Sequence, residues 1–267
     1  MSYEQIEIED RFEGKLKVIY LNQPHNYNSF TKQMLNEIYL CLEACNVDSR
    51  VRCVAITGKG DAFCAGQNLK EAIGLSENLH EERTVERMVV NYYNPLVRSI
   101  VKNTKPIIAL VNGAAVGAGA MLALICDFAL AKESSYLSQG FSKIGLIPDT
   151  AGTYFLPKLL GRQMANYLAF TGKKLYASEA KNLGLIAEVF KDEDFEDKAN
   201  QILEQISNLP TKALSITKDA FNKSYINNLE DQLELESRAQ QKAAETDDFK
   251  EGIAAFLEKR KPNYKGN

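Results

Sequence analysis

Tryptophan is absent from this chain of 267 residues, and histidine occurs only twice, at His25 and His80. Two histidines so far apart supply too few ligands for a catalytic zinc ion, so a metal hydrolase is poorly supported and no resident metal is expected. The motifs GxSxG and GxxxxGK[ST] are missing, and the segment Gly117 to Leu122 (GAGAML) lacks the third glycine of GxGxxG. Serine hydrolase, phosphate-loop and dinucleotide-binding chemistry are therefore not predicted.

An excess of one charge, paired cysteines and long apolar runs are also missing. The net charge of -3 gives no general attraction to nucleic acid or to acidic membranes, and no apolar stretch is long enough to span a bilayer. Residues 1–14 are acidic and lack the apolar centre of a signal peptide. We therefore expect a soluble, cytoplasmic protein with no nucleic-acid or membrane partner.

The cysteines fit the same compartment. They are scattered, odd in number and without a CxxC pair, which favours free thiols over a disulfide framework. Most of them lie inside apolar runs, where a thiol packs as a small apolar side chain. They are Cys41, Cys45, Cys53, Cys64 and Cys126.

Strand-like and helix-like patterns alternate over most of the chain. Short apolar runs predict strands and amphipathic spacing predicts helices, an alternation typical of an α/β fold with parallel strands. The predicted strands lie at 16–21, 51–57 and 107–111, and the predicted helices at 31–45 and 85–101.

The strand pattern stops after Asp194. Four helical segments follow, separated by Pro210, Asn227-Asn228 and Thr246-Asp247. We predict an α/β core over residues 1–193 and a C-terminal helical region over residues 194–267.

Two glycine-rich loops follow predicted strands. One lies in the stretch 112–127 (NGAAVGAGAMLALICD), where a glycine turn opens an apolar helix, and the other is GKGDAFCAGQNL at 58–69. The N–H groups at such a turn carry partial positive charge and can hold an oxyanion. The alternative is that the glycines only allow close packing or a positive φ.

These loops resemble those of the crotonase superfamily, the enoyl-CoA hydratases and isomerases. The resemblance rests on FCAGQNL, NGAAVGAG and FSKIGLIPDTAGT, and extends from LNQPHNYNSF near the first strand to AAFLEKRKP near the end. It implies a crotonase (ClpP-like) fold of repeated ββα units with a C-terminal helical region. It also implies a homotrimer or hexamer in which the last helices pack against a neighbouring subunit.

The resemblance places Met121 and Phe141 where hydratases of the family carry two glutamates. Water addition across a double bond needs one group for the water and one for the α-carbon proton, and neither apolar residue can serve. Asp149 stands where several isomerases keep an aspartate, and one carboxylate suffices to move a proton between two carbons. The alternative role of Asp149 is a helix cap that accepts N–H bonds from Ala151 or Gly152.

By the same resemblance, the backbone N–H groups of Gln67 and Ala118 form the oxyanion hole. Two such donors aimed at a thioester oxygen stabilise an enolate. Met121, Phe141 and Ile147 are expected to line the acyl pocket, exclude water and raise the pKa of Asp149. Ordinary core packing is the alternative for these three side chains.

The resemblance also implies where CoA binds. CoA is part of the substrate, and no separate cofactor is expected. Lys70 is otherwise a plain surface lysine and His25 a plain loop residue, and the loop 72–84 is expected to shape the acyl pocket. The predicted CoA-binding residues are His25, Asn26, Asn28, Ala65, Gln67, Asn68, Leu69 and Lys70, with Lys259 and Lys261 near the C-terminus.

Within the superfamily, FCAGQNL and GFSKIGLIPDTAGTYFLPKLLGR look most like the phenylacetate-pathway isomerases that convert ring-1,2-epoxyphenylacetyl-CoA to oxepin-CoA. The same residues would serve a Δ3,Δ2-enoyl-CoA isomerase, since both reactions place a thioester beside one carboxylate. We predict an acyl-CoA isomerase acting on one or both substrates. An enoyl-CoA hydratase of fatty-acid β-oxidation and a non-catalytic acyl-CoA-binding protein stay as alternatives.

Overall fold

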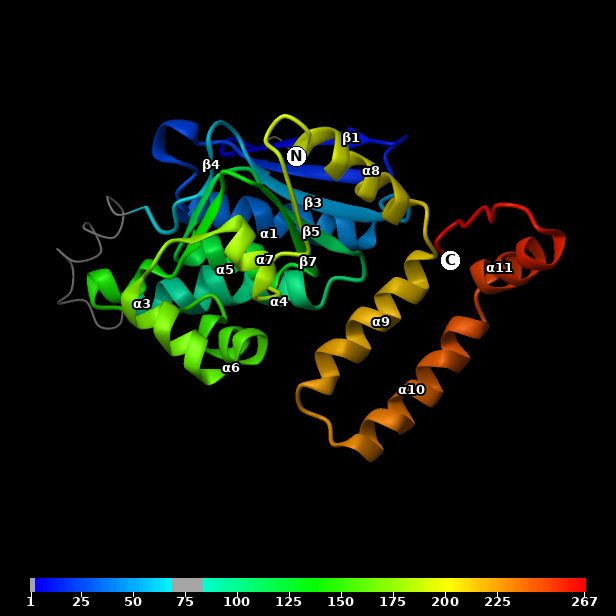
Figure 1. The fold of residues 1–267 in the computed structure, drawn as a ribbon. Helices are drawn as coiled ribbons and strands as arrows, with labels where there is room; N and C mark the ends of the chain where they lie inside the picture. The colour runs from blue at the N-terminus through cyan, green and yellow to red at the C-terminus, as the bar shows by residue number, and fades with distance from the viewer. Residues whose placement is uncertain (1–2, 69–83) are drawn as a thin grey trace.

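Two β-sheets form the centre of the protein, which the computed structural model describes over residues 3–68 and 84–267 (Figure 1). The larger sheet has the strand order β1-β2-β3-β5-β7-β10, with β1 antiparallel to β2 and every other neighbouring pair parallel. Buried apolar runs account for its central strands. Its strands are β1 (Ile6–Arg11), β2 (Leu16–Leu21), β3 (Cys53–Gly58), β5 (Ile107–Val111), β7 (Phe128–Lys132) and β10 (Glu188–Phe190).

The smaller sheet has the order β4-β6-β8-β9 and is parallel except for β9. Each strand β3, β5 and β7 of the large sheet is followed along the chain by one strand of the small sheet and then by helix. This is the repeated ββα unit expected of the fold. The small sheet consists of β4 (Ala62–Cys64), β6 (Ala114–Val116), β8 (Tyr136–Ser138) and β9 (Leu175–Tyr176).

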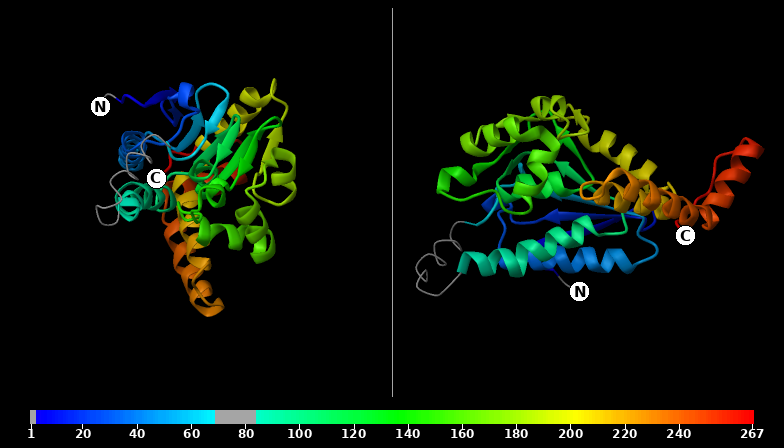
Figure 2. Two further views of the ribbon diagram at one scale, coloured as in Figure 1. Left: turned by 90° about the vertical axis from the view of Figure 1, so that its left-hand side faces the viewer. Right: turned by 90° about the horizontal axis from the view of Figure 1, so that it is seen from below.

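Helices cover both faces of the large sheet. On one face α1 (Lys32–Val47) and α4 (Asn94–Val101) lie side by side, as Figure 2 shows, and α5 (Ala118–Ile125) completes a continuous apolar core. On the other face α8 (Phe195–Ser207) buries Phe195 and Leu203 against the strands. The remaining helical elements are η1 (Pro24–Asn26), α3 (Thr84–Met88), η2 (Val89–Tyr93), η3 (Gly140–Ile144), α6 (Gly152–Thr171) and α7 (Ala177–Asn182).

Most predicted elements are confirmed. The strands at 16–21 and 107–111 have the predicted bounds, and the predicted helix at 31–45 is α1, which Thr31 caps by accepting the N–H of Met34 at 3.0 Å. The helix predicted over 85–101 contains a π-helical turn, η2, in which the N–H of Asn94 donates to the carbonyl of Val89. Pro95 follows, and its missing N–H and bulky ring disfavour the normal helical bond at this point.

The C-terminal region has the four predicted helices, but they divide differently from the predicted boundary. Helix α8 packs on the large sheet, so by its contacts it belongs with the core. The chain then leaves the core, and the last helices extend away from it (Figures 1 and 2). Packing therefore places the division after α8. The three extended helices are α9 (Thr211–Ser224), α10 (Leu229–Ala244) and α11 (Asp247–Glu258).

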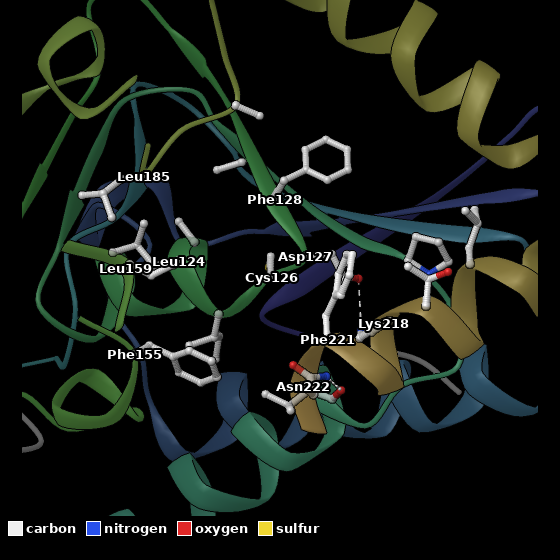
Figure 3. Close-up of a pocket in the computed structure, with 18 of the residues that line it drawn as sticks. Leu124, Cys126, Asp127, Phe128, Phe155, Leu159, Leu185, Lys218, Phe221 and Asn222 are labelled. Carbon is white, nitrogen blue, oxygen red and sulfur yellow. Dashed lines mark hydrogen bonds and ion pairs between the residues drawn. The ribbon is translucent and has the colours of Figure 1, made fainter. Parts of the chain in front are cut away.

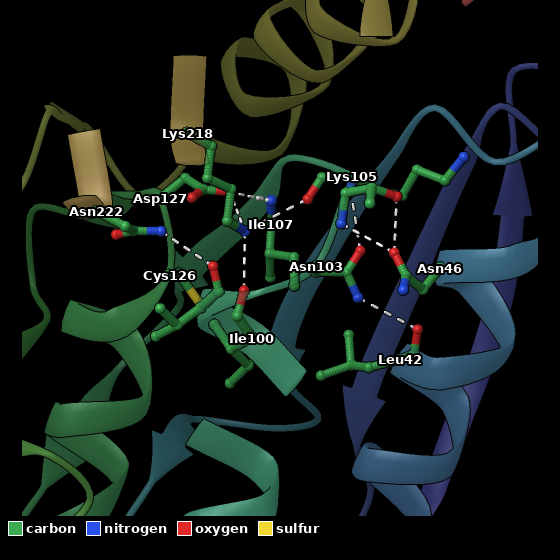
Figure 4. Close-up of polar contacts among 12 residues, drawn as sticks. Leu42, Asn46, Ile100, Asn103, Lys105, Ile107, Cys126, Asp127, Lys218 and Asn222 are labelled. Carbon is green, nitrogen blue, oxygen red and sulfur yellow. Dashed lines mark hydrogen bonds and ion pairs between the residues drawn. The ribbon is translucent and has the colours of Figure 1, made fainter. Parts of the chain in front are cut away.

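Polar contacts attach α9 to the core. The Nζ of Lys218 donates to the Oδ2 of Asp127 at 3.0 Å and to the carbonyl of Ile100 at 2.8 Å, and Asn222 donates to the carbonyl of Val101 at 3.0 Å (Figure 4). The Asp127 carboxylate also accepts the N–H of Ile107. Burial raises the pKa of Asp127 even though Lys218 opposes that shift. This contact therefore fixes the first of the extended helices.

A cavity of about 450 Å³ lies between α9 and the core (Figure 3). Its walls are mostly apolar, with Leu124, Phe155 and Phe221 on different helices and the Asp127–Lys218 pair at one side. No helix in the described part of the chain is both long and apolar enough to cross a membrane.

Candidate active site

The two glycine-rich loops meet because glycine removes a side chain at each contact. A Cβ atom built on Gly66 would lie 2.8 Å from the carbonyl oxygen of Val116 and 3.7 Å from the amide nitrogen of Ala118. A Cβ atom built on Gly119 would lie 2.2 Å from the carbonyl oxygen of Cys64. Close packing is therefore a real role of these glycines, and it brings the two predicted oxyanion loops together.

The strands that precede the loops explain why both loops lie at one edge. β4 and β6 are parallel neighbours, so their carboxyl ends face the same way. Ala118 is the first residue of α5, where an N–H group has no acceptor within the helix. On the other loop, the carbonyl of Gly66 accepts the N–H of Phe30 at 2.7 Å, and the N–H of Asn68 donates to the carbonyl of Phe30 at 2.9 Å.

Those two bonds set the direction of the Gln67 backbone. Gln67 pairs with Phe30 in a parallel β-bridge, and its neighbours make the hydrogen bonds toward Phe30. In an extended segment, the N–H of the residue between two such neighbours points to the opposite side. The predicted donor of Gln67 is thus directed away from Phe30, and its role as an oxyanion donor stays a prediction.

Sequence reasoning missed Tyr93, which contacts the same loop. Its Oη donates to the Oε1 of Gln67 at 2.5 Å, and its ring meets Phe30 edge to face at 6.1 Å between centroids. Tyr93 is the last residue of the π-helical turn η2 and is buried. The sequence signal that could have drawn attention here is Pro95, which marks an irregular helix, but nothing in the sequence pairs Tyr93 with Gln67.

Asp149 lies in the turn before α6, with its side chain partly buried. Its Oδ1 accepts a hydrogen bond from the Oγ1 of Thr150 at 2.9 Å. Burial raises the pKa of the carboxyl, and the Thr150 bond only partly offsets that rise. A carboxylate with a raised pKa is a better proton acceptor than an ordinary surface aspartate.

The capping alternative for Asp149 has no support at Gly152. The N–H of Gly152 donates to the backbone carbonyl of Asp149, at 2.7 Å, and not to its carboxylate. The N-cap position of α6 is occupied by Ala151, which has no side-chain hydrogen bond. Thr150 and Ala151 both have positive φ, of 50° and 60°, a costly conformation for two consecutive residues that hold the turn beside Asp149.

Two of the three residues predicted to line the acyl pocket are buried near this turn. Met121 lies under the start of α6, with its Sδ 3.4 Å from a Cβ atom built on Gly152, and the ring of Phe141 approaches Gly117. Ile147, in contrast, is 74% exposed. Its side chain lies at the surface of the single chain, and its place in the acyl pocket stays a prediction.

The side chain of Asn28 holds two loops together, which argues against its predicted role in CoA binding. It is fully buried, its Nδ2 donates to the carbonyls of Lys59 and Ala62 at 2.9 and 2.8 Å, and its Oδ1 accepts the N–H of Gln23 at 2.9 Å. These three bonds use both ends of the amide. Its side chain therefore joins two loops, both of its N–H donors are used, and its full burial leaves it no surface for a ligand.

The structure describes only some of the other predicted CoA-binding residues. His25 is exposed and Asn26 half-buried, and the N–H of Ala65 already donates to the carbonyl of Tyr27 at 3.0 Å. Leu69 and Lys70 lie outside the described residues, as do His80 and nearly all of the predicted pocket loop 72–84.

Lys259 and Lys261 do not join the site within one chain. Both are exposed, Lys259 ends α11, and α11 lies on the opposite side of the molecule from β4 and α3 (Figure 1). A contact between these lysines and CoA would require a second copy of the chain.

The cavity beside α9 is also separate from these residues. Within the described residues, its lining includes neither Gln67, Ala118 nor Asp149. No group of three or more potential metal ligands is found among the described residues. The candidate active site is therefore the edge where the Gln67 loop meets the start of α5, with the turn that carries Asp149 next to Met121 of α5.

Known proteins resemble the chain over nearly its whole length. A protein 41% identical over 250 residues is the 1,2-epoxyphenylacetyl-CoA isomerase of Escherichia coli, with 92% of this chain and 93% of that protein covered. A probable enoyl-CoA hydratase of Rhodobacter capsulatus is 38% identical over 266 residues, with both chains fully covered. The crystal structure of an enoyl-CoA hydratase from Bacillus anthracis matches with a TM-score of 0.92 at 34% identity, covering 99% of this chain and all of that one.

The family model for enoyl-CoA hydratase/isomerase matches residues 11–267. The match confirms the resemblance and the crotonase fold, and the solved structure agrees with both. The chain belongs to the enoyl-CoA hydratase/isomerase family.

Proposed function

We propose that this chain is an acyl-CoA isomerase with Asp149 as its one acid–base group. The observation that carries the proposal is the state of that carboxylate, which is partly buried, has a raised pKa and does not accept the N–H of Gly152. The two positions that resemble hydratase glutamates hold the apolar residues Met121 and Phe141, both buried. One carboxylate among apolar neighbours suits proton relay and leaves no second group for water.

The proposed chemistry is a proton transfer between two carbons of the acyl group. In a 3-enoyl thioester, Asp149 takes a proton from the α-carbon, and the electrons of that C–H bond delocalise over the thioester and the double bond. The protonated Asp149 then returns the proton to the γ-carbon, which moves the double bond next to the thioester. Nothing is gained or lost overall, so the carboxylate is regenerated in its starting state.

Two backbone donors stabilise the enolate in this proposal. The N–H groups of Gln67 and Ala118 belong to loops that Gly66 and Gly119 hold in contact. In other enzymes, one such donor contributes about 2.7–4 kcal/mol to transition-state stabilisation. Because both donors are backbone groups, the alanine at 118 can donate as glycine would.

For the substrate, we propose ring-1,2-epoxyphenylacetyl-CoA, a 3-enoyl-CoA, or both. The likeness to the Escherichia coli 1,2-epoxyphenylacetyl-CoA isomerase supports the first. The likeness to the Rhodobacter capsulatus probable hydratase keeps water addition as the second candidate. An acyl-CoA-binding protein without turnover is the third, and the raised pKa of Asp149 argues against it.

We further propose that the protein is a cytoplasmic homotrimer or hexamer. The extended helices and the turn between α9 and α10 expose apolar side chains that a neighbouring copy would cover, including Phe256 at 81% and Ile226 at 77% exposed. The described cysteines are free and buried, as suits a reducing compartment. Light scattering of the purified protein measures the oligomer directly.

The experiment that separates the three functions uses the purified protein and three substrates. Trans-3-enoyl-CoA, ring-1,2-epoxyphenylacetyl-CoA and trans-2-enoyl-CoA are incubated separately, and the products are identified by mass and absorbance. An isomer of unchanged mass supports the proposal and names the substrate. From trans-2-enoyl-CoA, whose double bond is conjugated with the thioester, a product heavier by one water supports the hydratase. Tight binding of all three thioesters without product supports the binding protein.

A further inference from the structure

Thr150, the residue that follows Asp149, stands in a conformation that does not suit it. Its side chain is 2% exposed, and its φ of 50° lies in the left-handed region. A β-branched residue is strained at a positive φ, where glycine or asparagine is the usual choice. Because strained residues gather at functional sites, the threonine side chain calls for a role that another residue type would not fill.

The hydroxyl of Thr150 makes one hydrogen bond among the described residues, and that bond goes to Asp149. Its Oγ1 donates to the Oδ1 of the carboxylate at 2.9 Å. No other side chain within residues 3–68 and 84–267 donates to this carboxylate. Oδ1 is therefore occupied, and in this part of the chain Oδ2 has no side-chain donor.

The backbone of this turn is already fixed, so the freedom that remains to Asp149 lies in its side chain. The N–H of Gly152 donates to the backbone carbonyl of Asp149 at 2.7 Å. A Cβ atom built on Gly152 would lie 3.4 Å from the Sδ of Met121 in α5, the helix that begins at Ala118. The terminal torsion of an aspartate is broad, so the carboxylate would rotate without the bond from Thr150.

We propose that Thr150 is a positioning residue that sets which oxygen of Asp149 reacts. This inference rests on the proposed isomerase function. The hydroxyl holds Oδ1 and keeps its own proton, so Oδ2 takes the proton from the α-carbon of the acyl group and returns it to the γ-carbon. In this role Thr150 touches neither the substrate nor the reacting atoms. Since a misplaced catalytic group costs rate, the effect of Thr150 falls on kcat rather than on KM.

The test compares Thr150→Val with wild type, using whichever proposed substrate the protein turns over. Valine keeps the branched shape and replaces only the hydroxyl by a methyl group. We expect kcat on the pH plateau to fall about tenfold, with KM within about a factor of two. The acid limb of kcat/KM should move up by about one pH unit, because the bond from Thr150 lowers the pKa of Asp149. A role limited to that pKa would instead leave the plateau kcat unchanged or higher, since Asp149 becomes the stronger base.

Three further variants complete the comparison, with circular dichroism of each to verify the fold. Thr150→Ser keeps the hydroxyl and should restore most of the lost kcat. Thr150→Gly accepts the positive φ without strain, so it removes the hydroxyl even if the valine variant does not fold, and it should lose kcat as valine does. Thr57→Val is the matched control: it removes a buried hydroxyl that donates to the carbonyl of Leu110 at 2.8 Å, and it should leave kcat and the acid limb unchanged.

Asp149→Asn, measured alongside, separates this inference from the proposed function. If Asp149→Asn loses activity while the folded Thr150→Val or Thr150→Gly variant keeps the wild-type kcat, the positioning role is wrong and the isomerase proposal stands. The same conclusion follows if Thr150→Ser is as slow as the variants without a hydroxyl. If Asp149→Asn keeps the wild-type rate, or the wild-type protein has no turnover, the proposed function fails and this inference fails with it.

Discussion

The Oη of Tyr93 donates a hydrogen bond to the side-chain Oε1 of Gln67 at 2.5 Å, across 26 positions of sequence. Gln67 carries one of the two predicted oxyanion donors on its backbone, so Tyr93 restrains the loop without touching the reacting atoms. The irregular helical turn before Pro95 is what places the Tyr93 ring there, edge on to Phe30. We therefore interpret Tyr93 as a positioning residue.

Tyr93→Phe should lower kcat about fivefold and leave KM within a factor of two. The variant keeps the ring packing on Phe30 and loses one hydrogen bond, worth about 1 kcal/mol, or roughly a fivefold rate effect. Tyr92→Phe is the control, because it removes the hydroxyl of the preceding, partly buried tyrosine. Equal effects of the two variants would mean that the Gln67 contact has no special role.

The raised pKa of Asp149 predicts an acid limb of kcat/KM displaced upward from that of an ordinary aspartate. Only the ionised carboxylate accepts the substrate proton, so the rate rises with pH through the folded-state pKa. The profile should be measured with whichever proposed substrate the protein turns over. An acid limb whose apparent pKa equals the ordinary aspartate value of about 4 would contradict a pKa raised by burial.

The same shift predicts a pH-dependent stability difference. A folded-state pKa above the unfolded value gives stability that is complete below the unfolded pKa and is lost as pH rises through the folded pKa. Asp149→Asn removes that loss, so the variant should gain stability over wild type as pH rises above about 4. Urea unfolding at several pH values measures this difference in unfolding free energy. If the variant lost stability relative to wild type as the pH rises, the predicted direction of the pKa shift would be wrong.

Asn28→Ala should destabilise the fold by about 2–3 kcal/mol. It leaves the carbonyl of Lys59 and the N–H of Gln23 without their partner, leaves the carbonyl of Ala62 only the 3.4 Å bond from Asn112, and places alanine at a φ of 54°. Asn26→Ala is the matched control, because the bonds from Ser29 go to the backbone carbonyl of Asn26. Unchanged stability with weakened CoA binding would restore the ligand role of Asn28.

Lys218→Met should loosen α9 from the core at a cost of about 2 kcal/mol. The variant leaves the Asp127 carboxylate partly buried without its cation, and hydrogen bonds to charged groups are worth about 1.5–3 kcal/mol. Lys223→Met is the control on the same helix, since its pair with Asp219 is exposed and such pairs contribute about 0.3–0.5 kcal/mol. Hydrogen exchange of the α9 amides should quicken in the first variant only.

Local patterns predicted the fold well because they are set by local physics. The strand 107–111 is a short buried run, and Thr31 shows its capping role by type and position. The role of Asn28 was not predictable, because its partners lie 31 and 34 positions away, at Lys59 and Ala62. The exposure of Ile147 likewise depends on how the turn after η3 lies on the surface, which periodicity does not encode.

The candidate site was predictable to a similar extent. Gly66 and Gly119 pointed to two loops, and the structure brings those loops into contact. The resemblance selected Asp149, and the structure shows its burial and its bond from Thr150. Tyr93 stayed hidden because a hydrogen bond between distant segments leaves no periodic signal in the sequence.

The most direct test of single-carboxylate isomerisation is the turnover of trans-3-enoyl-CoA and ring-1,2-epoxyphenylacetyl-CoA by Asp149→Asn, with circular dichroism and unfolding run on the same sample. If Asp149 is the general base, the variant folds, is at least as stable as wild type at neutral pH, and has a kcat lower by about 10²–10⁴, the usual contribution of a general base. A folded variant that turns over either substrate at the wild-type rate would contradict it.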